Sequence, residues 1–303
     1  MPAKMNPGRQ TPHQNRENTM TSNDWQIRPM TRDQMTLAVQ WAAEEGWNPG
    51  LQDGQAFNAS DPEGFLIGLY RGQPVGMVSA VQQGRYLGFM GFYIVRPGFR
   101  GQGWGWKLWQ AGLERLAGRC VGLDGVVDQQ ANYRRCGFEL AWHNARFEGR
   151  RPNELPPTPP AIQRLRVEEL DDWLELDARC AGEGHAPLLR AWLSQTDTVA
   201  LGASGFSGAY AFGAIRPCQT GFKVGPLFAE HPEQARLLLL ALLSHLPIGA
   251  RYQLDVPLCH KAAVILARTM ELVPVFETAR MYRGGIPALE VNGIYGITSF
   301  ELG

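Results

Sequence analysis

The sequence predicts a two-domain α+β protein, in which two similar halves are joined by a proline-rich linker. The chain has 303 residues, enough for two domains of ordinary size, and 44% hydrophobic residues, enough for packed cores. Residues 151–160 contain five prolines, a composition typical of an extended, semi-rigid connection. Similar orders of strands and helices precede and follow this linker. We therefore expect one domain at residues 24–150 and a second at residues 161–284.

The first half alternates predicted strands and helices. Thr31 and Gln34 have the spacing of a capping box and predict a helix from Thr31 to Glu45. The apolar spacing of residues 106–117 predicts a second helix, and a third carries Tyr133. Between the first helix and the next strand lies a stretch rich in Gly, Asn and Asp. The expected strands are residues 26–29, 65–70, 75–81, 85–95, 122–127 and 139–147.

The second half repeats this order. Its expected strands are residues 163–167, 198–203, 208–215, 222–228, 252–256 and 273–282, and its expected helices are residues 168–181, 187–195, 232–246 and 260–269. Repeated dipeptides support a duplication, because Gly91-Phe92 recurs as Gly221-Phe222, at an offset of 130 residues. Ala145-Arg146 recurs as Ala279-Arg280, at an offset of 134 residues. The two halves are therefore interpreted as a pseudo-repeat.

The most informative segment is Arg100 to Gly105, which reads Arg-Gly-Gln-Gly-Trp-Gly between a predicted strand and a predicted helix. A glycine-rich turn at a helix start exposes backbone N–H groups and the positive end of the helix dipole. Such a turn suits a phosphate or pyrophosphate, and we expect Gly103 and Gly105 to leave the backbone open to it. Neither a dinucleotide-binding fingerprint nor a P-loop fits, since Trp106 stands at the required third glycine and Lys107 follows no glycine.

A second motif lies 28 residues after Gly105, where Tyr133 to Phe138 reads Tyr-x-x-x-Gly-Phe. With the Arg-x-x-Gly-x-Gly turn, this resembles the GNAT superfamily of N-acetyltransferases. Further similarity extends from about Trp25 to the end and narrows the resemblance to a tandem-GNAT branch with a YitH-like second domain. The segments of this sequence that carry it are residues 45–50, 61–65, 123–127 and 295–303. The resemblance implies a mixed, mostly antiparallel twisted sheet flanked by helices in each domain. Val126 replaces an asparagine usual in the family.

The resemblance also implies roles for individual residues. Acetyl-CoA is the expected cofactor, bound by the end of one strand and by the glycine turn: Tyr93, Ile94, Val95, Arg100, Gly101, Gln102, Gly103, Trp104, Gly105 and Trp106. Backbone N–H groups around Val95 would polarise the thioester carbonyl. Tyr133 is the candidate general acid for the departing thiolate, and Asp124 is expected to be a second catalytic residue. The base is left open among Glu44, Glu45, Asp53, Asp124, His143 and a water chain.

The acceptor site is expected at Trp47, Asn48 and Asp53, because an acidic group and an aromatic ring suit a cationic amine. A packing role for Trp47 stays open. In the second half, Glu230, Glu233 and Ala235 replace the turn residues and Ala267 replaces Tyr133, at the offsets above. That domain is therefore predicted to be degenerate, with either a site-shaping or a purely structural role.

The C-terminal tail, residues 285–303, has no counterpart in the first half and is too apolar for a disordered end. We expect it to dock into the cleft between the halves, near the acceptor site. Glu301 or the terminal carboxylate of Gly303 is a further candidate base.

Composition narrows the function classes. The chain has 29 basic and 29 acidic residues and therefore no excess of positive charge. Its composition gives no reason to expect binding to nucleic acid or to an anionic membrane. Five cysteines without a Cys-x-x-Cys pair suit a reducing cytoplasm and predict no metal site. Residues 1–23 are interpreted as a disordered leader, and no signal indicates an oligomeric state. The predicted function is an acetyl-CoA-dependent N-acetyltransferase that acts on a small amine by direct transfer in a ternary complex. The alternative is a non-catalytic acyl-CoA sensor or partner-binding module.

Overall fold

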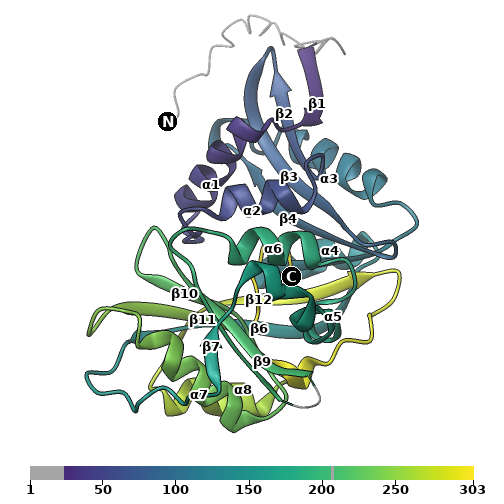
Figure 1. Cartoon of the computed structure of the whole chain (residues 1–303). Helices are drawn as coiled ribbons and strands as arrows, with labels where there is room; N and C mark the ends of the chain where they lie inside the picture. The colour runs from purple at the N-terminus through teal and green to yellow at the C-terminus, as the bar shows by residue number, and fades with distance from the viewer. Residues whose placement is uncertain (1–23, 206–207) are drawn as a thin grey trace, which may run out of the picture.

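The computed structural model describes residues 24–205 and 208–303, and the expected leader lies outside them (Figure 1). The strands form one 13-stranded sheet with the order β1-β2-β3-β4-β5-β12-β6-β11-β10-β9-β8-β7, and β13 pairs with β10. Among the strands of the described residues, only β4–β5 and β10–β11 pair in parallel. The mixed, mostly antiparallel character is therefore confirmed, and the strands of the two halves join into a single sheet.

The first half contains the expected strands, with ends that differ by a few residues. They are β1 (Trp25–Pro29), β2 (Phe65–Tyr70), β3 (Gln73–Gln83), β4 (Leu87–Val95), β5 (Cys120–Val126) and β6 (Glu139–Arg150). The helices are α1 (Met35–Glu44), α2 (Asp53–Ser60), α3 (Trp104–Arg115) and α4 (Gln130–Arg135). The capping box is present before α1, where the Gln34 amide oxygen accepts the Thr31 N–H at 3.0 Å. Helix α2 was not predicted; it forms because it buries Ala56 and Phe57.

The second half repeats this order. Its strands are β7 (Ile162–Arg164), β8 (Val199–Gly205), β9 (Gly208–Pro217), β10 (Phe222–Ala229), β11 (Arg251–Pro257) and β12 (Val273–Arg283), followed by β13 (Ile294–Gly296) in the tail. Its helices are α5 (Leu174–Ala181), α6 (Ala186–Leu193), α7 (Pro232–Leu243) and α8 (Lys261–Thr269). Short 3₁₀ helices lie at Arg32–Gln34, Pro97–Phe99, Val127–Gln129, Val167–Trp173 and Val291–Gly293.

The halves exchange a strand. Strand β6 belongs to the first half by sequence, yet its partners are β11 and β12 of the second half. Strand β12 in turn lies between β5 and β6 of the first half. The run β4-β5-β12-β6-β11-β10 is therefore symmetric about its centre, where Figure 1 shows β12 and β6 crossing the molecule together. Because of this exchange, neither half completes its central sheet alone.

Three hydrophobic cores hold the sheet and helices together. Helix α3 packs on strands of the first half, around Leu108 and Trp109. Helices α7 and α8 bury their leucines and alanines on strands of the second half. The third core joins the halves, because it contains residues of α1 and α2, of α5 and α6, and of the tail. Figure 1 shows the C-terminus in the middle of the molecule, between the two halves.

Candidate active site

A cleft opens in the first half where β4 and β5 separate. Their parallel pairing runs from Leu87 and Cys120 to Met90 and Leu123 and then stops. Just beyond this point β4 bulges away from its regular register with β3, and Phe92 takes a φ of 46°. A cavity of about 560 Å³ lies in the gap and is lined from both strands, from α3 and α4, and from the tail. A cavity of this size is typical of a small-molecule site.

The glycine turn lies at the start of α3, beside this cleft. Gly101 and Gly103 adopt φ values of 75° and 83°, and a Cβ at either position would meet no atom within 4 Å. Among the described residues, the N–H groups of residues 101–103 donate to no backbone carbonyl. Side chains hold the turn in shape, since Gln102 donates to the carbonyl of Gly98 at 3.1 Å. The turn therefore presents unpaired N–H groups and empty space, as an anion site requires.

Two residues of the turn have other roles than predicted. A Cβ on Gly105 would lie 2.4 Å from the Tyr93 hydroxyl oxygen, so this glycine makes room for a side chain of the protein and not for a ligand. Trp104 is buried and stacks on Trp25 at 4.5 Å, which directs it into the core. Trp106, by contrast, is 54% exposed and lines the cavity.

The remaining predicted cofactor residues lie along β4 and its end. Tyr93 lines the cavity, and Ile94 is buried. The carbonyl of Val95 accepts the Nε–H of Arg100 at 2.7 Å, and Arg100 also pairs with Glu45. This pairing occupies Glu45, one of the candidate bases.

Tyr133 lies on α4 against the opposite wall of the cleft. Its ring stacks on Trp109 at 5.6 Å and lies directly over Gly125 of β5, where a Cβ would come within 2.1 Å of it. Burial, with a smaller contribution from Tyr93, raises the pKa of Tyr133 to about 12. The phenol is therefore protonated at neutral pH and is available as a proton donor.

Asp124 also borders the cavity, but its carboxylate is fully paired. Both of its oxygens accept from Arg280 of β12, at 2.8 and 2.6 Å, and Oδ1 accepts from Asn144 at 2.7 Å. Burial raises the pKa of this carboxyl, and the Arg280 guanidinium opposes that shift. Because both of its oxygens are engaged by these donors, the geometry corrects the catalytic assignment and gives Asp124 a structural role between β5 and β12.

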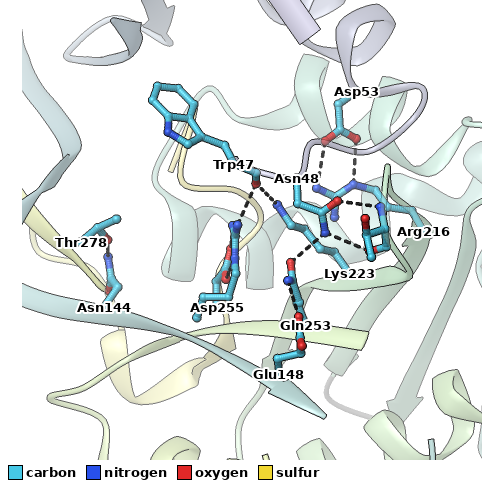
Figure 2. Close-up of polar contacts among 12 residues, drawn as sticks. Trp47, Asn48, Asp53, Asn144, Glu148, Arg216, Lys223, Gln253, Asp255 and Thr278 are labelled. Atoms are coloured by element: carbon cyan, nitrogen blue, oxygen red, sulfur yellow. Dashed lines mark hydrogen bonds and ion pairs between the residues drawn. The ribbon is translucent and has the colours of Figure 1, made fainter. Parts of the chain in front are cut away.

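Only Trp47 of the three predicted acceptor residues lines the cavity. Asn48 is turned to the second half, where it donates to the Thr220 carbonyl at 3.0 Å and to Gln253 at 3.1 Å. Asp53 is buried against Arg216 of β9, with contacts of 2.8 and 3.1 Å. Figure 2 shows both residues pointing away from the Trp47 ring, toward strands of the second half. Asn48 and Asp53 therefore fasten the halves together, which corrects their assignment to the substrate.

Further buried charges lie beside the cavity, and Arg146 is one of the residues that line it. Arg146 of β6 forms a two-pronged pair with Asp255 of β11, at 2.7 and 2.8 Å, and donates to the Trp47 carbonyl at 2.8 Å. Lys223 of β10 donates to the same carbonyl at 3.2 Å (Figure 2). Burial and the charge of Arg146 lower the pKa of Lys223. These contacts hold the loop around Trp47 in place from the second half.

The C-terminal tail reaches the cavity after β13. Phe300 and Glu301 line it, and Glu301 is only 5% exposed. Gly91 of β4 allows this approach, because a Cβ there would lie 2.2 Å from the Glu301 carbonyl oxygen. Gln83 of β3 donates to the Leu302 carbonyl at 2.6 Å. The terminal residue, Gly303, packs beside Phe89 and is not among the residues lining the cavity.

The corresponding opening in the second half is filled. Strands β10 and β11 pair in parallel only from Phe222 and Tyr252 to Val224 and Leu254, and then separate as β4 and β5 do. Strand β13 pairs with β10 in this gap, and the N–H of Ile297 donates to the Asp255 carbonyl of β11 at 2.8 Å. The tail therefore occupies the space that stays open in the first half. The turn before α7, which stands where the first half has its glycine turn, is also unfavourable for an anion, because it contains the acidic residue Glu230, paired with Arg179.

Comparisons with known proteins agree with these features. Residues 26–138 match a family model described as "Acetyltransferase (GNAT) family", and residues 173–296 match one described as "Acetyltransferase (GNAT) domain". A holothin acyltransferase from Pseudoalteromonas sp. (strain SANK 73390) is 30% identical over 279 residues, 92% of this chain and 95% of that protein. The chain belongs to the GNAT family. It is a tandem GNAT protein, and its relatives support acyltransferase activity.

Solved structures show the same fold. A putative acetyltransferase from Pyrococcus horikoshii has a TM-score of 0.79 at 22% identity and covers 96% of this chain and 100% of its own. A tandem GNAT protein from the clavulanic acid biosynthesis pathway has a TM-score of 0.60 at 14% identity, covering 87% and 100%. Among the described residues, no helix is long and apolar enough to cross a membrane, and no group of His, Cys, Asp and Glu has the arrangement of a metal site.

Proposed function

We propose that this tandem GNAT protein transfers the acetyl group of acetyl-CoA to a small amine by direct attack in a ternary complex. The observation that supports this most strongly is the cavity between β4 and β5, which is lined by Tyr133, by Trp47 on the acceptor side, and by Trp106 in the first turn of α3, directly after the glycine turn. The N–H groups at Gly101 and Gly103 would hold the pyrophosphate, and Trp106 would cover the pantetheine arm. Direct transfer follows because thioester and acceptor would enter the same cavity from opposite ends.

The chemistry requires an acid at the leaving sulfur. The amine nitrogen attacks the thioester carbonyl, whose oxygen is stabilised by backbone N–H groups of the β4 bulge. As the C–S bond breaks, Tyr133 donates its phenolic proton to the sulfur. The raised pKa of Tyr133, about 12, does not prevent this transfer, because burial in the same cleft also raises the proton affinity of the departing thiolate.

The cofactor assignment is tested with Gly103→Glu, which adds bulk and a negative charge where the pyrophosphate would lie. Calorimetry should show that the folded variant no longer binds acetyl-CoA. Gly249→Glu is a matched control, because Gly249 has a similar φ of 73° and an equally open surrounding in the second half. If Gly103→Glu keeps its affinity within about threefold of wild type, roughly 0.7 kcal/mol, the anion-turn assignment is wrong.

A further inference from the structure

The acceptor end of the cavity contains one carboxylate without a partner. Within residues 24–205 and 208–303, the Glu301 side chain forms no ion pair and no side-chain hydrogen bond, although it is 5% exposed. The other acidic side chains buried near the cavity are each paired with an arginine: Asp53 with Arg216, Asp124 with Arg280, and Asp255 with Arg146. The Glu301 oxygens are not among the fully buried side-chain atoms that lack a hydrogen-bond partner, so they are open to the cavity, where a cationic ligand group would pair with them.

We propose that Glu301 is the carboxylate that binds the acceptor's ammonium group and removes its proton, and that the acceptor is a primary amine with a flat apolar body. This rests on the proposed function, since it assigns the acceptor side of the same cavity. Eight aromatic residues line the cavity with Glu301, among them Trp47, Phe92, Phe276 and Phe300. Such rings suit a planar body and also favour a neighbouring cation.

The charges around Glu301 come from several strands. The negative charge of Glu301 contributes to raising the pKa of four groups: Asp124 of β5, Arg146 of β6, Arg216 of β9 and Lys223 of β10. The three arginine–aspartate pairs are neutral, and Lys223 balances Glu301 without contacting it. An added ammonium would give this buried group a net positive charge. The cluster therefore favours loss of one proton when the amine binds.

The step balances as follows. The ammonium gives one proton to the Glu301 carboxylate and becomes a neutral amine with a free lone pair. Nitrogen attacks the thioester carbon, the C–S bond breaks, and the sulfur takes the phenolic proton of Tyr133. The nitrogen then loses its second proton, which restores Tyr133 through solvent, and Glu301 releases its own proton to solvent. The products are an amide, free CoA and one proton.

Binding provides the first test and needs no turnover. The full chain is loaded with CoA and titrated with 2-phenylethylamine and with its uncharged counterpart 2-phenylethanol. Wild type should bind the amine at least tenfold more tightly, and Glu301→Gln should lose this preference. Glu277→Gln is the control, because Glu277 is an exposed carboxylate between two cavity-lining residues of β12. Loss of CoA loading in wild type would refute the proposed function. Loading without a preference for the amine, or a preference that survives Glu301→Gln, refutes only this inference.

Rates separate a base from a purely structural charge. 2-Phenylethylamine is an ammonium at pH 7, since alkylamines have pKa values of about 10, whereas 4-methylaniline is already neutral. Glu301→Gln should lower kcat/KM for the first about 100- to 10,000-fold and for the second less than tenfold. Its rate with the alkylamine should then rise tenfold per pH unit, following ionisation of the amine. Equal losses for both amines would mean that Glu301 only balances Lys223. If neither amine is turned over, the binding result alone decides.

Discussion

The contact between Gly125 and Tyr133 gives a direct test of the proposed acid. In Gly125→Ala, the new methyl group would lie 2.1 Å from one ring carbon of Tyr133 and 2.8 Å from the next, where ordinary contact is 3.4–4 Å. The ring must therefore withdraw by about 1.3 Å, toward the buried Trp109 on its other side. A displacement near 1 Å can cost about 100-fold in rate, while crowding a packed site costs about 1–3 kcal/mol of stability. We expect kcat to fall about 100-fold with acetyl-CoA affinity nearly unchanged.

The assay is thiol release at saturating acetyl-CoA, made in a double-mutant cycle with Tyr133→Phe. Removing the hydroxyl should lower kcat about 100- to 10,000-fold, and adding Gly125→Ala to that variant should then lower it little further. Gly122→Ala is the control on the same strand, because its methyl group would press on Tyr282 and Phe89 and not on Tyr133. If Gly125→Ala slows the Tyr133→Phe variant as much as it slows wild type, the reasoning about the acid is refuted.

Three other predictions concern how the two halves depend on each other. Asp53→Asn should destabilise the protein by about 3–5 kcal/mol at pH 7, because it leaves Arg216 buried without its partner. Burial opposes ionisation of Asp53, but Arg216 lowers its pKa below the unfolded value of about 4. The stabilisation by the ion pair is therefore present above the unfolded pKa and is lost as pH falls through the folded pKa. Urea unfolding should show a smaller difference in unfolding free energy between wild type and Asp53→Asn at pH 3 than at pH 7. Calorimetry should give one acetyl-CoA per chain, and two equivalent sites would contradict the plug formed by β13. A fragment of residues 1–150 should lack cooperative unfolding by circular dichroism, because β6 has no partner within it.

Local patterns predicted most of the elements and the glycine turn that precedes α3. The strands, the capping box at Thr31 and the helix after the glycine turn all depend on short-range spacing, which a single sequence displays. Helix α2 was missed, because its residues are rich in Gly, Asn and Asp and its formation depends on burying Ala56 and Phe57 against distant elements. The strand exchange was missed for a similar reason, since pairing partners more than 100 residues apart leave no local signal.

The polar site residues show the same limit. Asp53, Asn48 and Asp124 are each next to residues typical of a site, but their partners in the second half lie on β9, in the turn before β10, on β11 and on β12. Sequence position could not distinguish a carboxylate facing a substrate from one facing an arginine of the other half. The glycines were more informative than they seemed: Gly91 and Gly125 mark where the tail and Tyr133 press against the cleft strands. Close approach requires a missing Cβ, so unexplained strand glycines can identify the walls of a site.

The second half has acidic residues in place of the glycine turn and an alanine in place of the tyrosine, yet its residues reach the cleft of the first half. Strand β12 covers the outer edge of β5, and its Arg280 neutralises Asp124 on the cavity wall. Lys223 and Arg146 fix the carbonyl of Trp47 at the acceptor side. The tail, after filling the unused opening between β10 and β11, continues to the open one and delivers Glu301. The segment that fills the opening of the second half is thus the same one that lines the cavity of the first half.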